Sequence, residues 1–310
     1  MKCIIFGGGG FIGSAIADRL LREGHEVRIF ERPRVAQYRE FSADEKIEWI
    51  TGDFLNTNDI SNAIEGVNVV LHLISTTLPK GSNEDPIYDV NTNVVGTLQL
   101  LNAMIFRKVG RIVFISSGGT VYGNPLYLPI DELHPTNPLV SYGVTKLTIE
   151  KYLQLYEREH GIVAISLRVA NPYGERQRVE TAQGAVGVFL HRSISNLPID
   201  IWGDGSVNRD YIHISDVANA FSKAIFYNGA KRVFNVSSGV GTSLNDVIRE
   251  IECALNKNVV CNYLEKRDFD VPVNILSNEL VRREFNWSPA VSLQLGIKIT
   301  ADWMKKQLAR

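Results

Sequence analysis

Short apolar runs alternate with longer amphipathic stretches along the first two-thirds of the chain. Apolar runs of four to seven residues occupy positions 3–6, 26–30, 47–51, 67–73, 111–115 and 162–168. Apolar side chains recur at helical spacing over 11–23, 89–107 and 141–160. Short buried strands that alternate with helices predict a parallel sheet covered on both faces, the doubly wound α/β arrangement.

This alternation stops near residue 171, where prolines and glycines begin to separate shorter elements. We therefore expect a larger domain over residues 1–170 and a smaller, mixed lobe over 171–310. The boundary is expected to be interleaved. The apolar run at 233–236 belongs to a part of the chain, near 205–237, that we expect to return to the larger domain.

Composition narrows the class of protein. The 310 residues are 45% hydrophobic, which is enough for a large core, and the net charge of −1 gives no basic field for nucleic acid or anionic lipid. The three cysteines form no CxxC pair and the six histidines no ligand cluster, so we expect reduced thiols and no metal. The sequence shows neither a signal peptide nor a run of about 20 apolar residues. We expect a cytoplasmic protein that binds neither nucleic acid nor membrane.

A glycine-rich segment follows the first apolar run and opens the first helical stretch. Gly7, Gly10 and Gly13 are spaced GxxGxxG, with Phe11 and Ile12 inside the motif. Glycines at such a junction allow a sharp turn, a close approach of a pyrophosphate to the backbone, and tight packing of the helix on the sheet. The helix N-terminus then offers amide donors to phosphates. The position of the loop between strand and helix predicts a dinucleotide site.

Acidic residues follow the second and third strands. Glu31 comes about 20 residues after the glycines begin, where a carboxylate accepts hydrogen bonds from the adenosine ribose and repels a 2′-phosphate. This favours NAD over NADP. Arg32 and Arg34 follow at once and suit either a solvated turn or a 2′-phosphate. Asp53 could bind the adenine amino group, or could simply form the turn after Gly52.

The segment SYGVTK at residues 141–146 carries the candidate chemistry. Tyr142 and Lys146 are four residues apart on a predicted helix, so they share one face. An ammonium near a phenol favours the phenolate and lowers its pKa, and a tyrosine so tuned can act as a general base. Alone, a YxxxK pair is often a solvated helix pair. The glycine loop upstream strengthens the catalytic interpretation.

Together these motifs resemble the extended short-chain dehydrogenase/reductase family, and within it the nucleotide-sugar epimerases and dehydratases. The resemblance covers almost the whole chain. The matching segments are, in chain order, 7–13, His72-Leu73, 93–97, 116–123, 171–174, and 209–213 with Asp216. The set in this order is far more specific than any one motif.

The resemblance implies roles for particular residues. NAD would be held by Gly7, Gly10, Phe11, Ile12, Gly13, Glu31, Arg32, Asp53, Phe54, Leu73, Asn93, Ser116, Tyr142 and Lys146. A nucleotide-diphosphate sugar would be held by Asn171, Arg209, Arg267 and Asn274. The two arginines suit a diphosphate because a guanidinium offers planar, bidentate donors.

Two departures from the family pattern concern the segment at 117–120. The family usually places Ser or Thr four residues before the tyrosine of VYG, bonded to the reacting sugar oxygen, and here that position is Gly118. Ser117, Thr120 or water could take over. The dehydratases carry an Asp-Glu pair just after the Ser/Thr, whereas Gly119 and Thr120 stand here. A 4,6-dehydratase is therefore disfavoured.

The activity that the resemblance implies is epimerisation at C4 of a nucleotide-activated sugar, through a transient 4-keto intermediate with bound NAD. The substrate pair would be UDP-glucose and UDP-galactose, or the N-acetylhexosamine pair, because Asn274 replaces a bulky tyrosine of some 4-epimerases and leaves room for an acetamido group. Two alternatives stay open, a nucleotide-4-keto-sugar reductase and a non-catalytic cofactor-binding scaffold. We also expect a homodimer, since helices 89–107 and 141–160 are apolar on more than one face.

Overall fold

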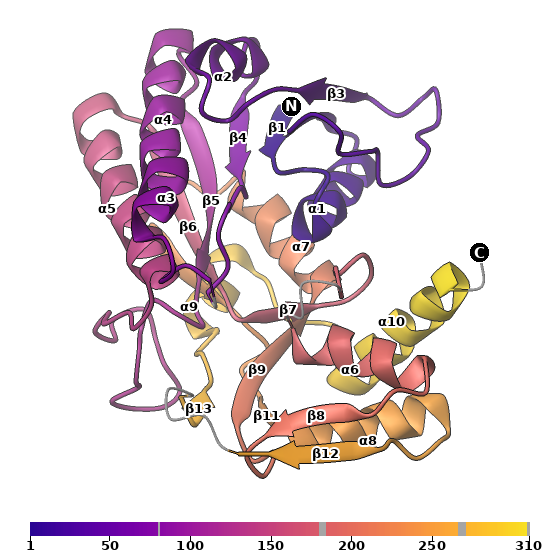
Figure 1. Cartoon of the computed structure of the whole chain (residues 1–310). Helices are drawn as coiled ribbons and strands as arrows, with labels where there is room; N and C mark the ends of the chain where they lie inside the picture. The colour runs from indigo at the N-terminus through magenta and orange to yellow at the C-terminus, as the bar shows by residue number, and fades with distance from the viewer. Residues whose placement is uncertain (80, 180–183, 266–270, 309–310) are drawn as a thin grey trace. The chain divides into compact units, whose positions relative to one another are not determined.

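The computed structural model describes residues 1–79, 81–179, 184–265 and 271–308. The chain folds into two compact units, each made of three chain segments (Figure 1). Unit 1 comprises Met1–Gly123, Pro135–Arg168 and Ala218–Phe234. Unit 2 comprises Asn124–His134, Val169–Val217 and Asn235–Arg310.

A seven-stranded sheet forms the centre of unit 1, in the order β10-β6-β5-β4-β1-β2-β3. Its strands are β1 Lys2–Phe6, β2 Glu26–Glu31, β3 Ile47–Thr51, β4 Val69–His72, β5 Arg111–Ser117, β6 Val163–Val169 and β10 Val233–Val236. The pairs β1/β2, β2/β3, β1/β4 and β4/β5 are parallel. The predicted doubly wound fold is confirmed. Strand order reverses between β1 and β4, and ligands of such sheets bind beyond the carboxyl ends of the strands at this point.

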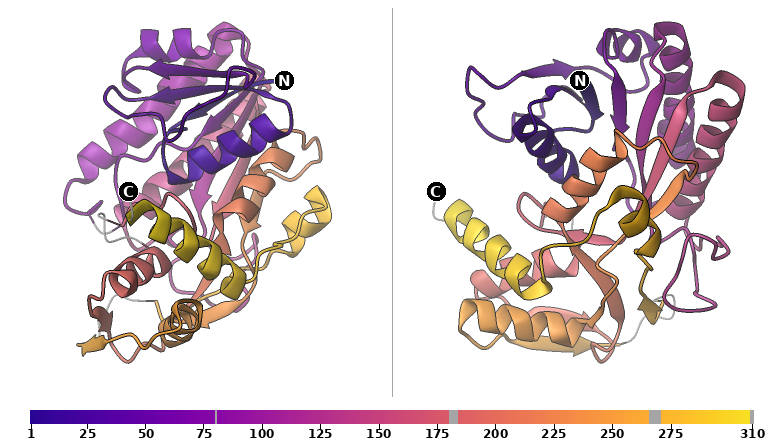
Figure 2. Two further views of the ribbon diagram at one scale, coloured as in Figure 1. Left: turned by 90° about the vertical axis from the view of Figure 1, so that its right-hand side faces the viewer. Right: turned by 180° about the vertical axis from the view of Figure 1, so that it is seen from behind.

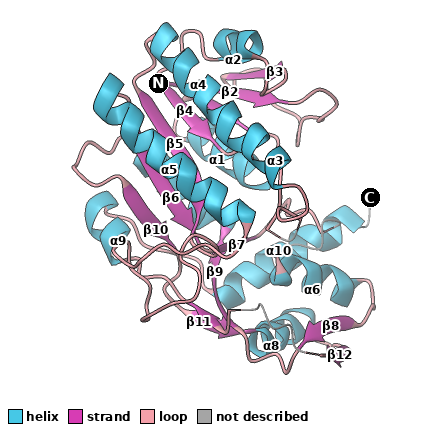
Figure 3. Ribbon diagram, turned by 60° about the vertical axis from the view of Figure 1, so that its left-hand side comes forward, coloured by secondary structure: helices cyan, strands magenta, loops and turns pink. Residues whose placement is uncertain are grey.

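The helices of this part of the chain cover both faces of the sheet. They are α1 Phe11–Arg22, α2 Thr57–Ala63, α3 Pro86–Asp89, the π-helix η1 Val90–Val95, α4 Gly96–Arg107, α5 Ser141–His160 and α7 Ile214–Ala224. Figure 3 shows α4 and α5 in front of the strands and α1 behind them. The helix predicted over 141–160 has those bounds in the structure, and the one predicted over 11–23 ends at Arg22.

The helix predicted over 89–107 is interrupted, because a π-helix separates α3 from α4. The wider turn carries Thr92 and Asn93, both buried, and Asp89 lies just before it with no exposed surface. Periodic apolar spacing does not predict a π-helical turn. Such turns are frequent at functional sites.

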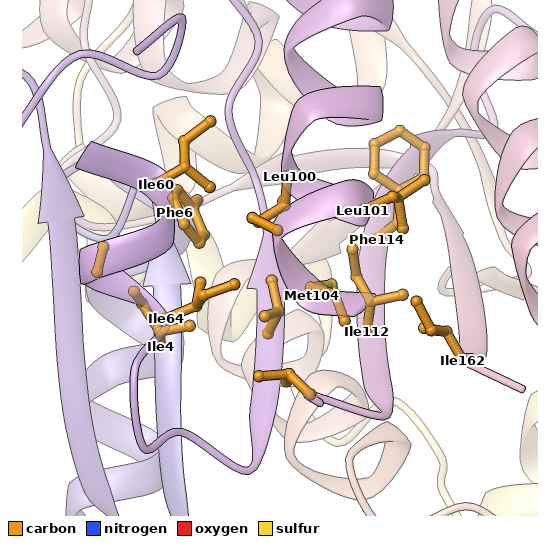
Figure 4. Packing of buried hydrophobic residues seen from close by; sticks show 14 of the residues in the cluster. Ile4, Phe6, Ile60, Ile64, Leu100, Leu101, Met104, Ile112, Phe114 and Ile162 are labelled. Carbon is orange, nitrogen blue, oxygen red and sulfur yellow. The ribbon is translucent and has the colours of Figure 1, made fainter. Parts of the chain in front are cut away.

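One layer of the core lies between the sheet and helices α2, α4 and α5 (Figure 4). Strand residues such as Ile4, Phe6 and Phe114 meet helix residues such as Ile60 and Leu100, all buried. Burial of apolar area of this extent is the main favourable term in folding. It fixes the strand ends from which the candidate site is built.

Unit 2 contains a mixed four-stranded sheet in which β9 pairs with β7, β11 and β13, of which only β11 is antiparallel to it. Its strands and helices are β7 Asn171–Tyr173, α6 Ala185–Ile194, β8 Ile199–Trp202, β9 Asn208–His213, β11 Gly241–Ser243, α8 Leu244–Leu255, β12 Cys261–Leu264, β13 Val273–Asn274, α9 Glu279–Phe285 and α10 Leu293–Leu308. Strands β8 and β12 form a separate parallel pair.

Helices α6, α8 and α10 lie together in this unit and share one apolar cluster (Figure 2). Helix α10 approaches Tyr173 closely at Gly296, where a Cβ atom would lie 2.1 Å from the tyrosine oxygen. None of the helices in the described part of the chain is long and apolar enough to cross a bilayer.

Candidate active site

The glycine loop between β1 and α1 leaves no room for side chains. Gly7 has a φ of +84°, a conformation that glycine adopts without strain. A Cβ on Gly13 would lie 2.2 Å from the carbonyl oxygen of Gly7, and one on Gly8 would lie 2.8 Å from Ile29. The loop brings bare backbone to the start of the twelve-residue helix α1, whose first turn holds no acidic residue. This cradle fits the pyrophosphate of a dinucleotide.

Glu31 lies beside this loop. A Cβ on Gly9 would lie 2.9 Å from Glu31 Cγ and 2.9 Å from the ring of Trp49. Glu31 Oε2 accepts a hydrogen bond from the backbone N–H of Arg32 at 3.2 Å. The structure thus brings the predicted ribose-binding carboxylate to the glycine loop, which fits NAD.

The other residues predicted on the cofactor side follow β3 and β4. Asp53 accepts a hydrogen bond from Leu55 N at 2.9 Å, so it forms the turn that the sequence offered as its alternative role. Phe54 is buried, and its ring lies 5.6 Å from that of Phe6. Leu73 N donates to Phe6 O at 3.0 Å, which holds the end of β4 against the end of β1. Cofactor contacts by these residues stay predictions.

Tyr142 and Lys146 lie on the first two turns of α5, as their spacing predicts. Lys146 is 3% exposed, and its ammonium donates to Ile115 O at 3.1 Å and lies 4.8 Å from the ring centroid of Phe114. The ammonium is 5.5 Å from the ring centroid of Tyr142. The pair therefore shares one side of α5, facing the end of β5.

The pKa values of this pair differ from the sequence-based expectation. Burial raises the pKa of Tyr142 to about 12, although the residue as a whole is only partly covered. The Ser75 side chain has a smaller, lowering effect on this pKa, and the charge of Asp89 raises it. The predicted lowering by Lys146 is absent, and burial outweighs the other effects. Burial also lowers the pKa of Lys146 to about 8, against the charges of Asp89 and Glu150.

Asp89 is a residue of this site that the sequence analysis missed. Its Oδ2 accepts hydrogen bonds from Ser141 at 2.7 Å and Thr145 at 2.8 Å, on either side of Tyr142. Its Oδ1 accepts from Thr77 at 2.5 Å and from Asn93 at 2.9 Å. One carboxylate thus fixes the start of α5 to the segment after β4. Three hydroxyls and an acid scattered over residues 77–145 give no local signal in the sequence.

Asn93, predicted to contact the cofactor, belongs to the same network. Its Nδ2 donates to Asp89 and to Thr76 Oγ1 at 3.0 Å, and its Oδ1 accepts from Thr76 N at 3.0 Å. The polar contacts of this side chain in the described part of the chain are all with other protein groups. Asn93 therefore holds the backbone of the segment after β4 in place.

A second buried carboxylate lies one turn beyond Lys146. Glu150 and Arg168 are 1% and 4% exposed and form a bidentate ion pair, with a shortest contact of 2.6 Å. Glu150 also accepts a hydrogen bond from Ser116 at 2.5 Å, so the hydroxyl of this predicted cofactor residue is engaged in the interior. Arg168 donates to Tyr122 OH at 2.9 Å.

The segment at 117–120 contains the hydroxyls proposed in place of a side chain at Gly118. Thr120 Oγ1 is buried and has no hydrogen-bond partner in the part of the chain that the structure describes. Its backbone oxygen lies 2.7 Å from where a Cβ on Gly143 would be, so the segment packs directly on α5. Neither Ser117 nor Thr120 has a side-chain hydrogen bond to Tyr142 in the described residues.

In unit 2, three of the predicted substrate residues lie on adjacent strands. Asn171 is on β7, Arg209 on β9 and Asn274 on β13, with Asn274 directly opposite Arg209. Asn171 Nδ2 donates to Asp210 O at 2.9 Å, and Arg209 Nη1 donates to Val271 O at 2.6 Å. Arg267 lies outside the described residues. A guanidinium is a group that can bind phosphate oxygens through two parallel hydrogen bonds.

Comparisons with known proteins agree with this geometry. A family model described as "NAD dependent epimerase/dehydratase family" matches residues 3–237. The chain is 32% identical to the UDP-glucose 4-epimerase of Mycolicibacterium smegmatis, over 99% of each chain. It is 32% identical to a dTDP-4-dehydro-6-deoxyglucose reductase of Escherichia coli, over 95% of this chain and 94% of the other. The UDP-glucose 4-epimerase of Thermotoga maritima, solved with UDP-glucose, superposes with a TM-score of 0.93 at 29% identity, over 99% and 100% of the two chains.

Proposed function

The chain belongs to the NAD dependent epimerase/dehydratase family, and from that membership we propose that it is an NAD-dependent epimerase acting at C4 of a UDP-activated sugar. The observation that carries the proposal is the Tyr142–Lys146 pair on α5, in the unit that also carries the glycine loop. The buried carboxylate of Asp89 fixes the turn of α5 that carries this pair, through Ser141 and Thr145. The similarity to UDP-glucose 4-epimerases over the full chain supports the same activity.

Tyr142 is proposed to remove the proton from the sugar 4-hydroxyl and to return it after the sugar has turned over. Lys146 keeps a buried positive charge near the phenol and, in this family, is expected to bind the nicotinamide ribose. When bound, the dinucleotide supplies the carbon that accepts and returns hydride, and in its oxidised form a positive charge that favours the Tyr142 phenolate. The glycine loop and Glu31 are proposed to hold its pyrophosphate and adenosine ribose.

Arg209 is proposed to bind the substrate diphosphate, together with Arg267. Its position on the central strand β9, opposite Asn274, supports a phosphate-binding role for this part of the small sheet. We propose further that the N-acetylhexosamine sugars are accepted, because Asn274 is smaller than the tyrosine of some 4-epimerases.

A 4-keto-sugar reductase is the alternative that one relative favours, since the Escherichia coli protein carries that name. A reductase consumes its reduced cofactor in each turnover, whereas an epimerase regenerates its own. The requirement for added NADH therefore separates the two. A cofactor-binding scaffold has no need of the buried Tyr142–Lys146 arrangement, and we do not favour it.

We also propose that the protein is a homodimer that acts in the cytoplasm. Helices α3 to α5 carry exposed apolar side chains, among them Ile87, which is 74% exposed, and Phe106, which is 76% exposed. Large exposed apolar residues on neighbouring helices are typical of an association surface. All three cysteines are free thiols, which suits a reducing compartment.

The proposal is tested by incubating the purified protein with UDP-glucose, and separately with UDP-N-acetylglucosamine, without added cofactor. Proton NMR of the anomeric region should show the C4 epimer of each. The Y142F variant should show at least about a 100-fold slower rate, because a general base contributes that much or more. Turnover that requires added NADH and a 4-keto sugar would replace the proposal with the reductase.

A further inference from the structure

Helix α5, which carries Tyr142, begins without a capping side chain of its own. Val140 stands at the N-cap position, and a valine has no oxygen that can accept a hydrogen bond from the first amides of the helix. The acceptors come from residues 58 and 60 positions earlier in the chain. Ser141 N donates to Asn83 Oδ1 at 2.7 Å, and Tyr142 N donates to Ser82 Oγ at 3.0 Å.

We propose that residues 82–89, which we call the capping segment, position the catalytic Tyr142 for proton transfer. Ser82 is the positioning residue that holds the backbone of Tyr142. Asp89, at the other end of the segment, is a positioning residue that holds the side chains on either side of Tyr142. The proposal rests on the epimerase function and adds to it residues that act through Tyr142.

The hydroxyl of Ser82 is held in one orientation. Ser82 has no exposed surface, and its Oγ donates to Pro79 O at 3.2 Å while it accepts from Tyr142 N. Its own backbone N–H donates to Leu78 O at 3.0 Å. A hydroxyl whose proton is already donated turns its lone pairs towards the remaining donor. The amide of Tyr142 therefore meets an acceptor that is fixed by the rest of the turn.

Asp89 holds the same turn of α5 through side chains. It has no exposed surface, and its Oδ2 accepts from the hydroxyls of Ser141 at 2.7 Å and Thr145 at 2.8 Å. A shift of the first turn of α5 would break these bonds together with the bond from Tyr142 N to Ser82. Because a misplacement of about 1 Å can cost about 100-fold in rate, two independent sets of contacts at the general base favour a catalytic reason for them.

The charge of Asp89 does not explain its presence beside the general base. A negative charge disfavours the phenolate, and the carboxylate of Asp89 raises the pKa of Tyr142. Its contribution to catalysis therefore lies in the position that it gives to the first turn of α5. The proposed role involves no covalent step, because Tyr142 alone takes the proton of the sugar 4-hydroxyl and returns it.

The first test compares S82A with T148V, in which the hydroxyl removed donates to Val144 O of its own helix. S82A removes the acceptor of the Tyr142 amide and should lower kcat by about 10- to 100-fold. KM should stay within about threefold, because Arg209, the proposed diphosphate ligand, belongs to the other unit. T148V should retain the activity of the parent.

A second variant removes the contacts of Asp89 with α5 and leaves its charge in place. S141A/T145V deletes the two hydroxyls that Oδ2 binds, and should lower kcat by about 10-fold or more. S141T/T145S keeps both hydroxyls and should recover most of this loss. A kcat equal to that of the parent in both S82A and S141A/T145V would overturn the proposal.

Amide hydrogen exchange tests the same positions without substrate or cofactor. In S82A the amides of Ser141 and Tyr142 should exchange about 10-fold faster than in the parent, the equivalent of one lost hydrogen bond, while the amide of Leu153 further along α5 keeps its rate. Equal acceleration along the whole helix, or no change at the first two amides, would overturn the proposal. If the parent epimerises no UDP-sugar, the proposed function fails instead, and the exchange rates still decide whether the capping segment fixes Tyr142.

Discussion

Lys146 shows at the scale of one residue how a functional group can work against folding. Its ammonium is buried and donates a hydrogen bond to Ile115 O, and burial lowers its pKa from 10.5 to about 8. The folded state therefore binds fewer protons than the unfolded state between these two values. Stability rises with pH across this window, and below pH 8 the buried charge lowers the free energy of unfolding by about 3 kcal/mol.

Replacing Lys146 should consequently stabilise the protein while it abolishes turnover. K146M is expected to be more resistant to urea than the parent at pH 7, and the difference should shrink as pH rises from 8 towards 10.5. K151M, an exposed lysine on the same helix, is the control and should show no such trend. A K146M advantage that is constant with pH would mean that folding does not lower the pKa of Lys146.

Some residues of the site belong to short sequence motifs, whereas others are recognised only from contacts between distant parts of the chain. The glycine spacing and the Tyr142–Lys146 pair lie within a few positions of one another, so they can be predicted from the sequence. Asp89 contacts Ser141 and Thr145 from more than 50 positions away in the chain. Only the fold brings these groups together.

At the scale of elements, the strands and long helices follow from apolar periodicity, whereas the π-helix at Val90–Val95 does not. Regular spacing describes which face of a helix is buried. Apolar spacing does not predict that the side chains of Asp89 and Asn93 hydrogen-bond to each other in the interior. In this structure their contact coincides with the wider turn of the π-helix. Apolar spacing also fails to predict short helices such as α2. The N-cap of this helix, Asn56, accepts hydrogen bonds from two backbone amides.

The close packing where β1 meets α1 allows us to predict the effect of adding one methyl group at Gly13. In G13A the new Cβ would lie 2.2 Å from Gly7 O, so the helix and the loop must separate. We expect the purified variant to lose most of its bound NAD, as measured by absorbance after denaturation. G110A is the matched change, since a Cβ there meets nothing within 4 Å. Retention of NAD by G13A would show that the cofactor does not use this loop.

The ion pair under α5 should contribute strongly to stability when broken from one side. R168M leaves the Glu150 carboxylate buried without its cation, so a loss of about 3–5 kcal/mol in the free energy of unfolding is expected. R158M removes an exposed pair whose arginine side chain is 74% exposed, and should cost less than about 1 kcal/mol. Urea titrations of both variants measure the contrast, and equal losses would contradict it.

At the scale of the whole molecule, each of the two units is assembled from three separate chain segments. One crossing between the units follows Arg168. The others, at 124–134 and 218–234, bring small pieces into units defined mainly by distant segments. The amino-acid composition does not show where the chain passes from one unit to the other, because these crossings depend on packing between distant segments.

The proposed homodimer is tested on the exposed apolar residues of α3 to α5. F106E should shift the protein towards monomers in sedimentation velocity, since it places a charge on the proposed association surface. L133E alters a residue that is 88% exposed outside those helices, and should leave the assembly unchanged. A parent protein that sediments as a monomer at all concentrations would remove the proposal.

In the proposed epimerase reaction, one protein removes hydride from a sugar carbon and restores it to the same carbon. The most direct measurement gives the protein UDP-glucose that carries deuterium at C4, in ordinary water and without added cofactor. We expect UDP-galactose with the deuterium still on C4, because hydride returns from the group that received it. Product whose C4 deuterium has been replaced by solvent hydrogen, or no epimer at all, would exclude this reaction.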